Sequence, residues 1–465
     1  MALIKSISGI RGTIGGKAGE NLTPQDIVEC TAAFGQWVKE KTSIPKIVIG
    51  RDARISGEIV SSLVISTLRL QGIDVVDLGY STTPTVEMAV PLENAGAGII
   101  LTASHNPKQW NALKLLNQKG EFISGEDGKE VLDKIAEGSI EYAEVDKLGT
   151  YKKDDSYIQK HIDQIFALDL VTVEAVRELA PKVVVDCINS TGAISIIPLL
   201  EQMGCTVIPL NEEMTGRFAH NPEPLPGNLS ALSEAVKFNN AKLGIAVDPD
   251  VDRLALVCED GEMFGEEYTL VAVADYVLQH TPGATVSNLS SSRALRDLAE
   301  KNGVSYQATA VGEVNVVEKM KETNAVIGGE GNGGIIYPEL HYGRDALVGV
   351  ALILSYLAKF GKPLSFLKST YPSYTISKNK IQLSPEINLD LVFAGLKEKY
   401  SHQPLNTIDG LKIEFDNDWV HLRKSNTEPI IRIYAESTSE VTSNNLADKI
   451  KQDIKEILTQ TANHG

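Results

Sequence analysis

Three aspartates at alternate positions follow an apolar run and have the oxygen groups that metal chemistry needs. Asp248, Asp250 and Asp252 stand in the segment IAVDPDVDR, which Arg253 closes. Carboxylate oxygens are preferred ligands of hard divalent cations, and Mg²⁺ usually keeps coordination places for water and phosphate oxygens. We therefore predict that these three side chains converge on one Mg²⁺.

Two other interpretations of this segment stay open on the motif alone. An EF-hand calcium loop needs glycine where Arg253 stands and a helix in place of LGIAV, so Glu259 at the twelfth position is attributed to coincidence. A phosphatase of the aspartyl-phosphate class would use Asp248 as its nucleophile and Asp250 as its acid and base.

A serine and a histidine follow another apolar run, in the segment LTASHNPKQWNALK. Ser104 is the candidate nucleophile, and His105, Asn106 and Lys114 add groups that can stabilise a phosphoryl group during its transfer. The alternative is a structural serine that caps a turn or a helix. A serine hydrolase is disfavoured because the GxSxG elbow is absent and adjacent serine and histidine residues do not make a triad.

A glycine-rich segment, GGEGNGG at 328–334, follows a further apolar run. Its glycines let a ligand approach the backbone, and the carboxylate of Glu330 and the amide of Asn332 are groups that bind sugar hydroxyls. The alternative is an ordinary glycine-rich turn. The segment fits neither the phosphate-binding P-loop nor the dinucleotide fingerprint, because it lacks their endings and spacings.

A basic, hydroxyl-rich loop near the C-terminal end is a candidate phosphate site in an otherwise acidic chain. It offers many hydrogen-bond donors to one anion. Its residues are Arg423, Lys424, Ser425, Asn426 and Thr427. Arg11, in SGIRG, is a second candidate for binding phosphate. The alternative interpretation is that it is an ordinary surface arginine.

The elements that position these residues are short apolar runs, each followed by a polar or glycine-containing turn and a helix-like stretch. The pattern predicts parallel or mixed α/β sheets with ligand sites at the carboxyl ends of strands. The runs are KIVIG before 51–54, AGIIL before 102–107, KVVVD before 187–192, LGIAV before 248–253 and NAVIG before 329–334.

The last hundred residues differ from this pattern. WVHLR and IIRIYAE flank the loop KSNTEP and predict an antiparallel hairpin in an α+β unit. Apolar residues at helical spacing over 443–461 predict an amphipathic helix.

Length and composition limit the class of protein. A chain of 465 residues predicts three or four domains. It has 43% hydrophobic residues, and no apolar run approaches the roughly 18 residues of a membrane span. The formal net charge of -17 disfavours nucleic acid as a partner. Four cysteines without a CxxC pair suit neither a zinc site nor a disulfide framework, and no signal peptide is recognisable, so a cytoplasmic location is expected.

Taken in order, the segments TASHNP, DPDVDR, GEGNGG and RKSNTEP resemble the phosphoserine, metal, sugar-specificity and phosphate-binding loops of the α-D-phosphohexomutase superfamily. The resemblance covers essentially the whole chain. It implies three similar mixed-sheet α/β domains and a C-terminal α+β domain around a central cleft. The expected domains are 1–153, 154–256, 257–366 and 367–465.

The resemblance also implies roles for the candidate residues. Ser104 is the phosphorylated nucleophile and, with the three aspartates, holds one Mg²⁺. Lys114 and Arg11 stand where the superfamily keeps its acid/base and phosphate-stabilising groups. Arg253 lies beside the metal, and Glu330 and Asn332 bind sugar hydroxyls. The phosphate that is not reacting is bound by Arg423, Ser425, Asn426 and Thr427.

The implied reaction interconverts hexose 6-phosphate and hexose 1-phosphate through a 1,6-bisphosphate, which also serves as activator. The partner is a small phosphosugar, and the expected assembly is a monomer or homodimer. Reorientation of the bisphosphate favours a mobile fourth domain.

The sugar is the least determined part of the resemblance. Relatives that act on mannose or glucose phosphates usually carry serine and histidine where this chain has Asn332 and Gly334. The EGNGG form resembles a subgroup of phosphoglucosamine mutases, so glucosamine phosphate is favoured, with mannose or glucose phosphate as the alternative. His341 is expected to pack rather than to replace the missing imidazole.

Overall fold

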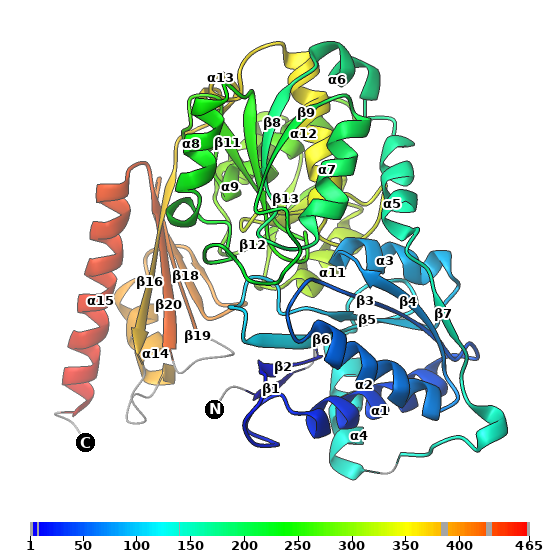
Figure 1. The fold of residues 1–465 in the computed structure, drawn as a ribbon. Helices are drawn as coiled ribbons and strands as arrows, with labels where there is room; N and C mark the ends of the chain where they lie inside the picture. Colours follow the sequence, from blue (N-terminus) through cyan, green and yellow to red (C-terminus); the bar gives the residue numbers. More distant parts are fainter. Residues whose placement is uncertain (1–2, 7–8, 139, 383–388, 425–429, 463–465) are drawn as a thin grey trace.

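The computed structural model describes residues 3–6, 9–138, 140–382, 389–424 and 430–462. Four β-sheets follow one another along the chain, each with its own helices (Figure 1). The first three sheets mix parallel and antiparallel pairs, and the fourth is antiparallel throughout its described strands. The predicted fold class, three mixed-sheet α/β units followed by an α+β unit, is confirmed.

The first sheet has helices on both faces, each packed over its own apolar cluster. Helices α1 (Pro24–Lys41), α2 (Gly57–Leu70) and α4 (Gly125–Glu137) cover one face, and α3 (Thr83–Leu92) covers the other. The strand order is β1 (Leu3–Ser6), β2 (Gly9–Thr13), β6 (Trp110–Leu116), β5 (Ala97–Leu101), β3 (Lys46–Arg51), β4 (Asp74–Tyr80) and β7 (Tyr151–Lys153).

The second sheet has four strands and is accompanied by four helices. Its order is β11 (Leu254–Cys258), β10 (Leu243–Val247), β8 (Lys182–Asp186) and β9 (Thr206–Leu210). Its helices are α5 (Tyr157–Phe166), α6 (Val173–Leu179), α7 (Gly192–Gln202) and α8 (Ser230–Phe238).

The third sheet also has four strands, and its helices complete a core that it shares with the second sheet. Its order is β13 (Tyr306–Thr309), β12 (Thr285–Asn288), β14 (Ile327–Glu330) and β15 (Gly334–Ile336). One apolar cluster extends from α5 and the second sheet to the third sheet. The helices are α9 (Glu266–Leu278), α10 (Ala294–Lys301), α11 (Glu313–Thr323), α12 (Ala346–Phe360) and α13 (Leu364–Ser369).

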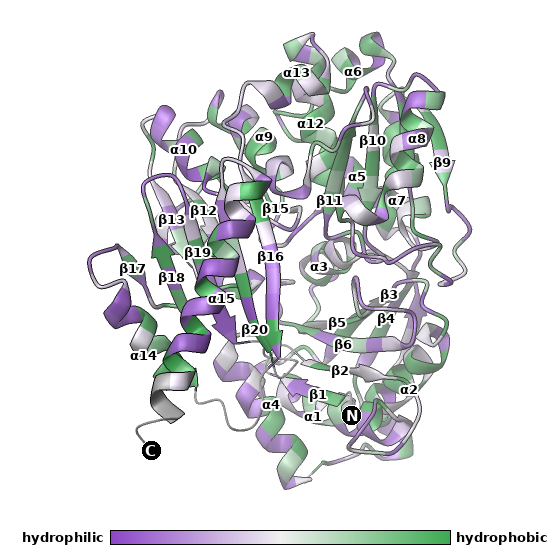
Figure 2. Ribbon diagram, turned by 90° about the vertical axis from the view of Figure 1, so that its left-hand side faces the viewer, coloured by the Kyte–Doolittle hydropathy of each residue, from purple (hydrophilic) through white to green (hydrophobic). Residues whose placement is uncertain are grey.

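The fourth sheet lies beside the others, at the left of Figure 1, with two helices on one face. The predicted hairpin and C-terminal helix are both present, as β19, β20 and α15. Helix α15 carries hydrophobic and hydrophilic residues in alternation (Figure 2), and its apolar side packs on the sheet. The elements are β16 (Thr375–Gln382), β20 (Ile430–Ser437), β19 (Trp419–Lys424), β18 (Leu411–Glu414), β17 (Leu405–Asn406), α14 (Leu389–Lys399) and α15 (Glu440–Ala462).

Two of the expected domain limits fall inside elements. The limit between residues 256 and 257 lies within β11, which pairs with β10 as far as Cys258. The limit between 366 and 367 lies within α13, a short helix that begins after Pro363. Polar and proline-containing stretches mark turns as well as linkers, which is why composition alone places such limits only approximately. Among the described residues, no helix is both long and apolar enough to cross a membrane.

Candidate active site

Ser104 lies on a tight turn just beyond the carboxyl end of β5. Its backbone φ of 47° is in the left-handed region, which residues other than glycine rarely adopt. The turn is held by Thr102, whose Oγ1 accepts a hydrogen bond of 2.9 Å from the Ser104 amide and donates one of 2.6 Å to Asp52. The strained turn and its hydrogen bonds hold the serine hydroxyl at the carboxyl end of β5.

Arg54 fastens this turn from the next loop of the same sheet. Its guanidinium is buried, with only 1% of the residue exposed, and its Nε lies 3.1 Å from Asp52. It donates to the backbone carbonyls of Ser104 at 2.5 Å, Asn106 at 2.6 Å, Pro107 at 2.8 Å and Trp110 at 2.9 Å. Sequence reasoning missed Arg54, although a charged group directly after the buried run KIVIG is the signal that marks it.

The aspartate loop follows β10 and meets the serine turn. The Ser104 Oγ donates a hydrogen bond of 2.6 Å to Asp248 Oδ2. Asp248 Oδ1 accepts from the amides of Asp252 and Arg253, both at 3.2 Å. Between the aspartates, Val251 has a φ of 61°, which is a steric outlier for a β-branched residue. The loop is therefore forced into the shape that aims the three carboxylates at one point.

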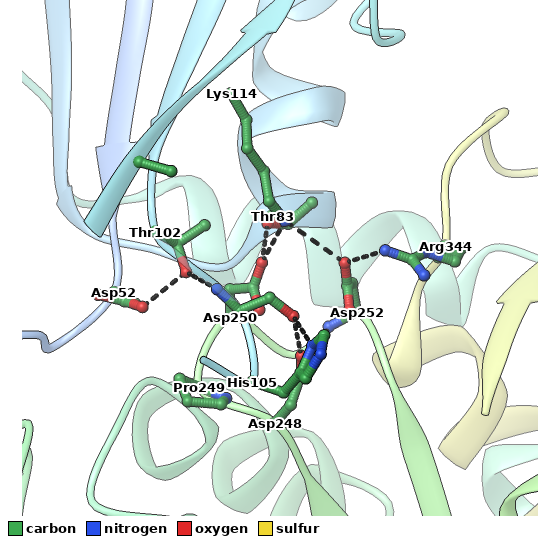
Figure 3. Close-up of polar contacts among 12 residues, drawn as sticks. Asp52, Thr83, Thr102, His105, Lys114, Asp248, Pro249, Asp250, Asp252 and Arg344 are labelled. Atoms are coloured by element: carbon green, nitrogen blue, oxygen red, sulfur yellow. Dashed lines mark hydrogen bonds and ion pairs between the residues drawn. The ribbon is translucent and has the colours of Figure 1, made fainter. Parts of the chain in front are cut away.

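Asp250 receives one donor from helix α3 and one from strand β6, as Figure 3 shows. Thr83 Oγ1 donates to Asp250 Oδ2 at 2.6 Å, and Lys114 Nζ donates to the same oxygen at 2.8 Å. Burial acts to raise the pKa of Asp250, but the Lys114 charge together with the hydrogen bonds from Lys114 and Thr83 outweighs it, and the pKa lies below its usual value. Lys114 also lies 3.6 Å from Asp252 Oδ2. The predicted serine, lysine and aspartates are thus brought together.

Arg344 approaches the aspartates from the opposite side, as Figure 3 shows for Asp252. Its guanidinium donates to Asp252 Oδ2 at 2.7 Å, to Glu330 Oε2 at 2.7 Å and to Glu313 Oε2 at 3.0 Å. These ion pairs raise the pKa of Arg344 above its usual value despite its burial. Sequence reasoning did not single out Arg344, because it lies ten residues beyond the glycine-rich motif, in a segment with no recognisable pattern.

The three aspartates fit a hard divalent cation. Each offers a carboxylate oxygen, and these oxygens lie within 4.8 Å of one another. Within the described parts of the chain, Asp250 Oδ1 and Asp252 Oδ1 are buried without a hydrogen-bond partner. Burial raises the pKa of Asp248 well above its usual value, and Asp252 and Asp250 raise it further. Unpaired buried carboxylates are costly, and a cation bound between them offsets that cost.

His105 and Arg253 lie beside the serine and the aspartates. His105 Nδ1 is 3.3 Å from the Ser104 Oγ, and burial, with the Arg253 charge second, lowers the pKa of the imidazole well below its usual value. Arg253 is 9% exposed, and its Nη1 lies 3.5 Å from Glu223.

The glycine-rich segment forms the turn between β14 and β15. Glu330 is 3% exposed, and besides Arg344 its oxygens accept from Asn288 at 2.8 Å and from the Gly312 amide at 3.1 Å. Asn332 is half-buried, and its Oδ1 accepts from the Gly334 amide at 3.1 Å.

The presence of glycine at position 334 follows from Arg344, which packs against it. A Cβ on Gly334 would lie 2.3 Å from Arg344 Cδ, so the arginine fills the space that a side chain at 334 would need. His341 does not take that place. It bonds Asp345, outside the aspartate loop.

Further cations lie between the first and fourth sheets. Arg11 is on β2, where burial and then the charge of Arg432 lower its pKa. Arg423 is opposite Arg432 in the pairing of β19 with β20, and its Nε lies 3.2 Å from Asp409. The predicted phosphate-site residues Ser425, Asn426 and Thr427 lie outside the described residues.

Known proteins show the same organisation. Profiles of the phosphoglucomutase/phosphomannomutase domains match residues 3–141 (α/β/α domain I), 156–261 (α/β/α domain II), 265–374 (α/β/α domain III) and 382–452 (C-terminal domain). A phosphoglucomutase/phosphomannomutase from Thermococcus kodakarensis is 38% identical over 92% of this chain and 94% of its own. A probable phosphoglucosamine mutase from Methanopyrus kandleri is 36% identical over 95% of both chains. The crystal structure of a phosphoglucomutase/phosphomannomutase family protein from Burkholderia thailandensis has a TM-score of 0.84, at 26% identity over 98% of this chain and 97% of its own.

These matches define the class of the protein, an enzyme of the phosphohexomutase type. The chain belongs to the phosphoglucomutase/phosphomannomutase family, within the α-D-phosphohexomutase superfamily. The resemblance inferred from its four motifs is confirmed.

Substitution of Arg54 tests its role in holding the serine turn. Arg54→Lys lowers turnover at least about 10-fold and lowers the melting temperature by several degrees, because one ammonium cannot satisfy four carbonyls and Asp52 at once. Steady-state kinetics and thermal denaturation measure the two effects. Arg69→Lys is the matched control, since among the described residues the Arg69 side chain donates one hydrogen bond, to the Gly149 carbonyl at 3.0 Å, and none to the serine turn. Equal behaviour of the two variants would contradict the role given to Arg54.

Proposed function

We propose that this enzyme interconverts glucosamine 6-phosphate and glucosamine 1-phosphate, with Ser104 carrying the transferred phosphoryl group. The observation that carries the proposal is the 2.6 Å hydrogen bond from the Ser104 Oγ to Asp248, within a strained turn that presents the hydroxyl. A hydroxyl held against a carboxylate and next to a candidate cation site suits phosphoryl transfer, which depends on positioning and on charge stabilisation.

The aspartates and Ser104 would hold one Mg²⁺. Asp248, Asp250 and Asp252 supply only oxygen ligands, and two of their buried oxygens have no other described hydrogen-bond partner. When bound, the ion supplies positive charge that stabilises the phosphoryl group during transfer.

The chain's own groups position the reactants. As the bond between phosphorus and the Ser104 Oγ breaks, a bond forms to a sugar hydroxyl oxygen, and the hydroxyl proton passes to a neighbouring side chain while the Ser104 Oγ regains one. His105, whose Nδ1 is 3.3 Å from the Ser104 Oγ, would accept the sugar hydroxyl proton, and the Lys114 ammonium, 2.8 Å from Asp250 Oδ2, would donate a proton to the Ser104 Oγ. Arg11 adds charge on the phosphate side.

The product of the first transfer is a hexose 1,6-bisphosphate, which must turn before its other phosphate returns to Ser104. The same bisphosphate, added from solution, would load the serine as an activator. Arg423, with Ser425, Asn426 and Thr427, would hold the phosphate that is not reacting. Arg253 would lie beside the metal, and Glu330 and Asn332 would bind sugar hydroxyls.

Glucosamine is favoured over the neutral hexoses on two grounds. The Methanopyrus kandleri relative, matched along 95% of the chain, is named a probable phosphoglucosamine mutase. The glycine-rich turn also has the EGNGG form at 330–334 that resembles the phosphoglucosamine mutase subgroup. The Thermococcus kodakarensis name keeps glucose and mannose phosphates as the alternative.

We further propose that the enzyme works in the cytoplasm as a monomer or homodimer on small phosphosugars, without a nucleic-acid or membrane partner. The acidic net charge of -17 supports the absence of nucleic-acid binding.

Removal of the nucleophile tests the reaction. Ser104→Ala lowers mutase turnover by about 10⁴-fold or more, because the phosphoryl group loses its carrier. A coupled assay with added hexose 1,6-bisphosphate measures it. Ser62→Ala, on the exposed face of α2, is the control and retains full activity. Substantial turnover in Ser104→Ala would refute the assignment.

Specificity constants test the sugar. The 1-phosphates of glucosamine, glucose and mannose are compared at saturating Mg²⁺ with a trace of bisphosphate. We expect kcat/KM for the glucosamine phosphate to be at least about 10-fold the others, the size of effect that one ionic contact gives. A higher value for mannose or glucose 1-phosphate would leave the mutase reaction standing and overturn the choice of sugar.

A further inference from the structure

A second group of metal-ligating side chains lies where the first three sheets' elements meet. His161 is on α5, His341 is in the loop after β15, and Asp345 is the N-cap of α12. Asp345 Oδ2 lies 2.9 Å from His161 Nε2 and 3.3 Å from His341 Nε2, and one ligand atom of each residue lies within 4.8 Å of the other two. The cluster shares no residue with the aspartate loop.

The distances from Asp345 Oδ2 to the two imidazole nitrogens, 2.9 and 3.3 Å, fit a metal site as well as hydrogen bonds. With metal–nitrogen and metal–oxygen bonds of about 2.0 to 2.2 Å, ligand atoms in a tetrahedral zinc site lie roughly 3.3 Å apart. Two imidazoles and one carboxylate are also the ligand set of zinc sites with three protein ligands. Mg²⁺ prefers oxygen ligands, so this cluster suits a different ion from the one that suits the three aspartates.

Each histidine has an acceptor beside its other ring nitrogen. His161 Nδ1 lies 3.0 Å from Thr85 Oγ1, and His341 Nδ1 lies 3.5 Å from Glu87 Oε2. Metal-bound histidines usually donate their second ring N–H to such an acceptor, which fixes the tautomer that turns Nε2 to the metal. The two outer partners both come from α3, so the arrangement spans α3, α5 and α12.

Glu87 is the second observation that points to a bound ion. It is 2% exposed, and among the described residues neither of its carboxylate oxygens has a hydrogen-bond partner. A Cβ on Gly343 would meet Glu87 Oε2, so glycine at 343 leaves the space that this carboxylate occupies. A buried, unsatisfied carboxylate is costly, and an imidazole N–H committed to it by metal binding at the far nitrogen offsets the cost.

We propose that His161, His341 and Asp345 bind a second divalent cation of the zinc class, with Thr85 and Glu87 as the outer hydrogen-bond partners of the two histidines. The ion ties α3 and α5 to the start of α12. Because Arg344 precedes Asp345 and donates to Asp252 and Glu330, the ion also fixes the arginine that borders the aspartate loop. The proposal does not depend on the mutase reaction or on its sugar.

Cobalt binding tests the proposal, since Co²⁺ takes zinc sites and its visible absorption reports nitrogen ligands. The full chain is stripped with a chelator, equilibrated with excess Mg²⁺ to saturate the aspartates, and titrated with Co²⁺, with equilibrium dialysis giving the stoichiometry. We expect one equivalent of Co²⁺ with a visible band that Zn²⁺ abolishes. His341→Ala weakens Co²⁺ binding about 100-fold or more, and Glu87→Gln weakens it about 10-fold.

Two matched controls locate the ion. Asp250→Asn alters the aspartate loop and leaves Co²⁺ binding unchanged, and His402→Ala removes an exposed histidine with no effect. Circular dichroism checks the fold of each variant. If His341→Ala is unfolded, the proposal is tested by Glu87→Gln, which removes no metal ligand. Binding that is absent in the wild type, unchanged in the folded His341→Ala and Glu87→Gln variants, or lost in Asp250→Asn would overturn the proposal.

Discussion

The structure depends on gathering several carboxylates in a buried place without leaving their charges unpaired. Asp248, Asp250 and Asp252 are all 0% exposed. Donor groups approach them from several parts of the fold, among them Lys114 on β6, Arg344 before α12, and the hydroxyls of Ser104 and Thr83. Burial of like charges is tolerated only with such partners, so the site holds its shape only while several domains supply them. Asp250 Oδ1 and Asp252 Oδ1, which have no hydrogen-bond partner among the described residues, leave a place for a cation.

Two arginines connect this electrostatic requirement to the fold. Arg54 binds four backbone carbonyls and so determines the course of the serine turn, while Arg344 joins the aspartate loop to the glycine-rich turn through Asp252 and Glu330. A guanidinium suits both tasks because its planar fork donates several hydrogen bonds in fixed directions. The same residue explains Gly334, since Arg344 occupies the space a side chain there would take.

The strands, the serine turn and the aspartate loop could be predicted from the sequence, because apolar runs and the polar residues directly after them are local signals. Arg344, His161 and Glu87 could not, since their roles arise from contacts between segments up to 184 residues apart, such as His161 with Asp345. Periodicity and motif spacing carry no information about such pairs. The expected domain limit at 256/257 falls inside β11, because the pairing of β11 with β10 continues to Cys258 and composition does not report strand pairing. The roles of Ser425, Asn426 and Thr427 stay predictions.

The central claim is that Ser104 carries the phosphoryl group, and its covalent state tests that claim most directly. The full-length enzyme is incubated with hexose 1,6-bisphosphate and Mg²⁺, quenched, and examined by intact mass and peptide mass spectrometry. We predict one phosphoryl group on the peptide containing Ser104, stable in acid and released in base, as a phosphate ester on serine behaves. A base- and acid-labile acyl phosphate on Asp248, with Ser104 unmodified, would contradict the account.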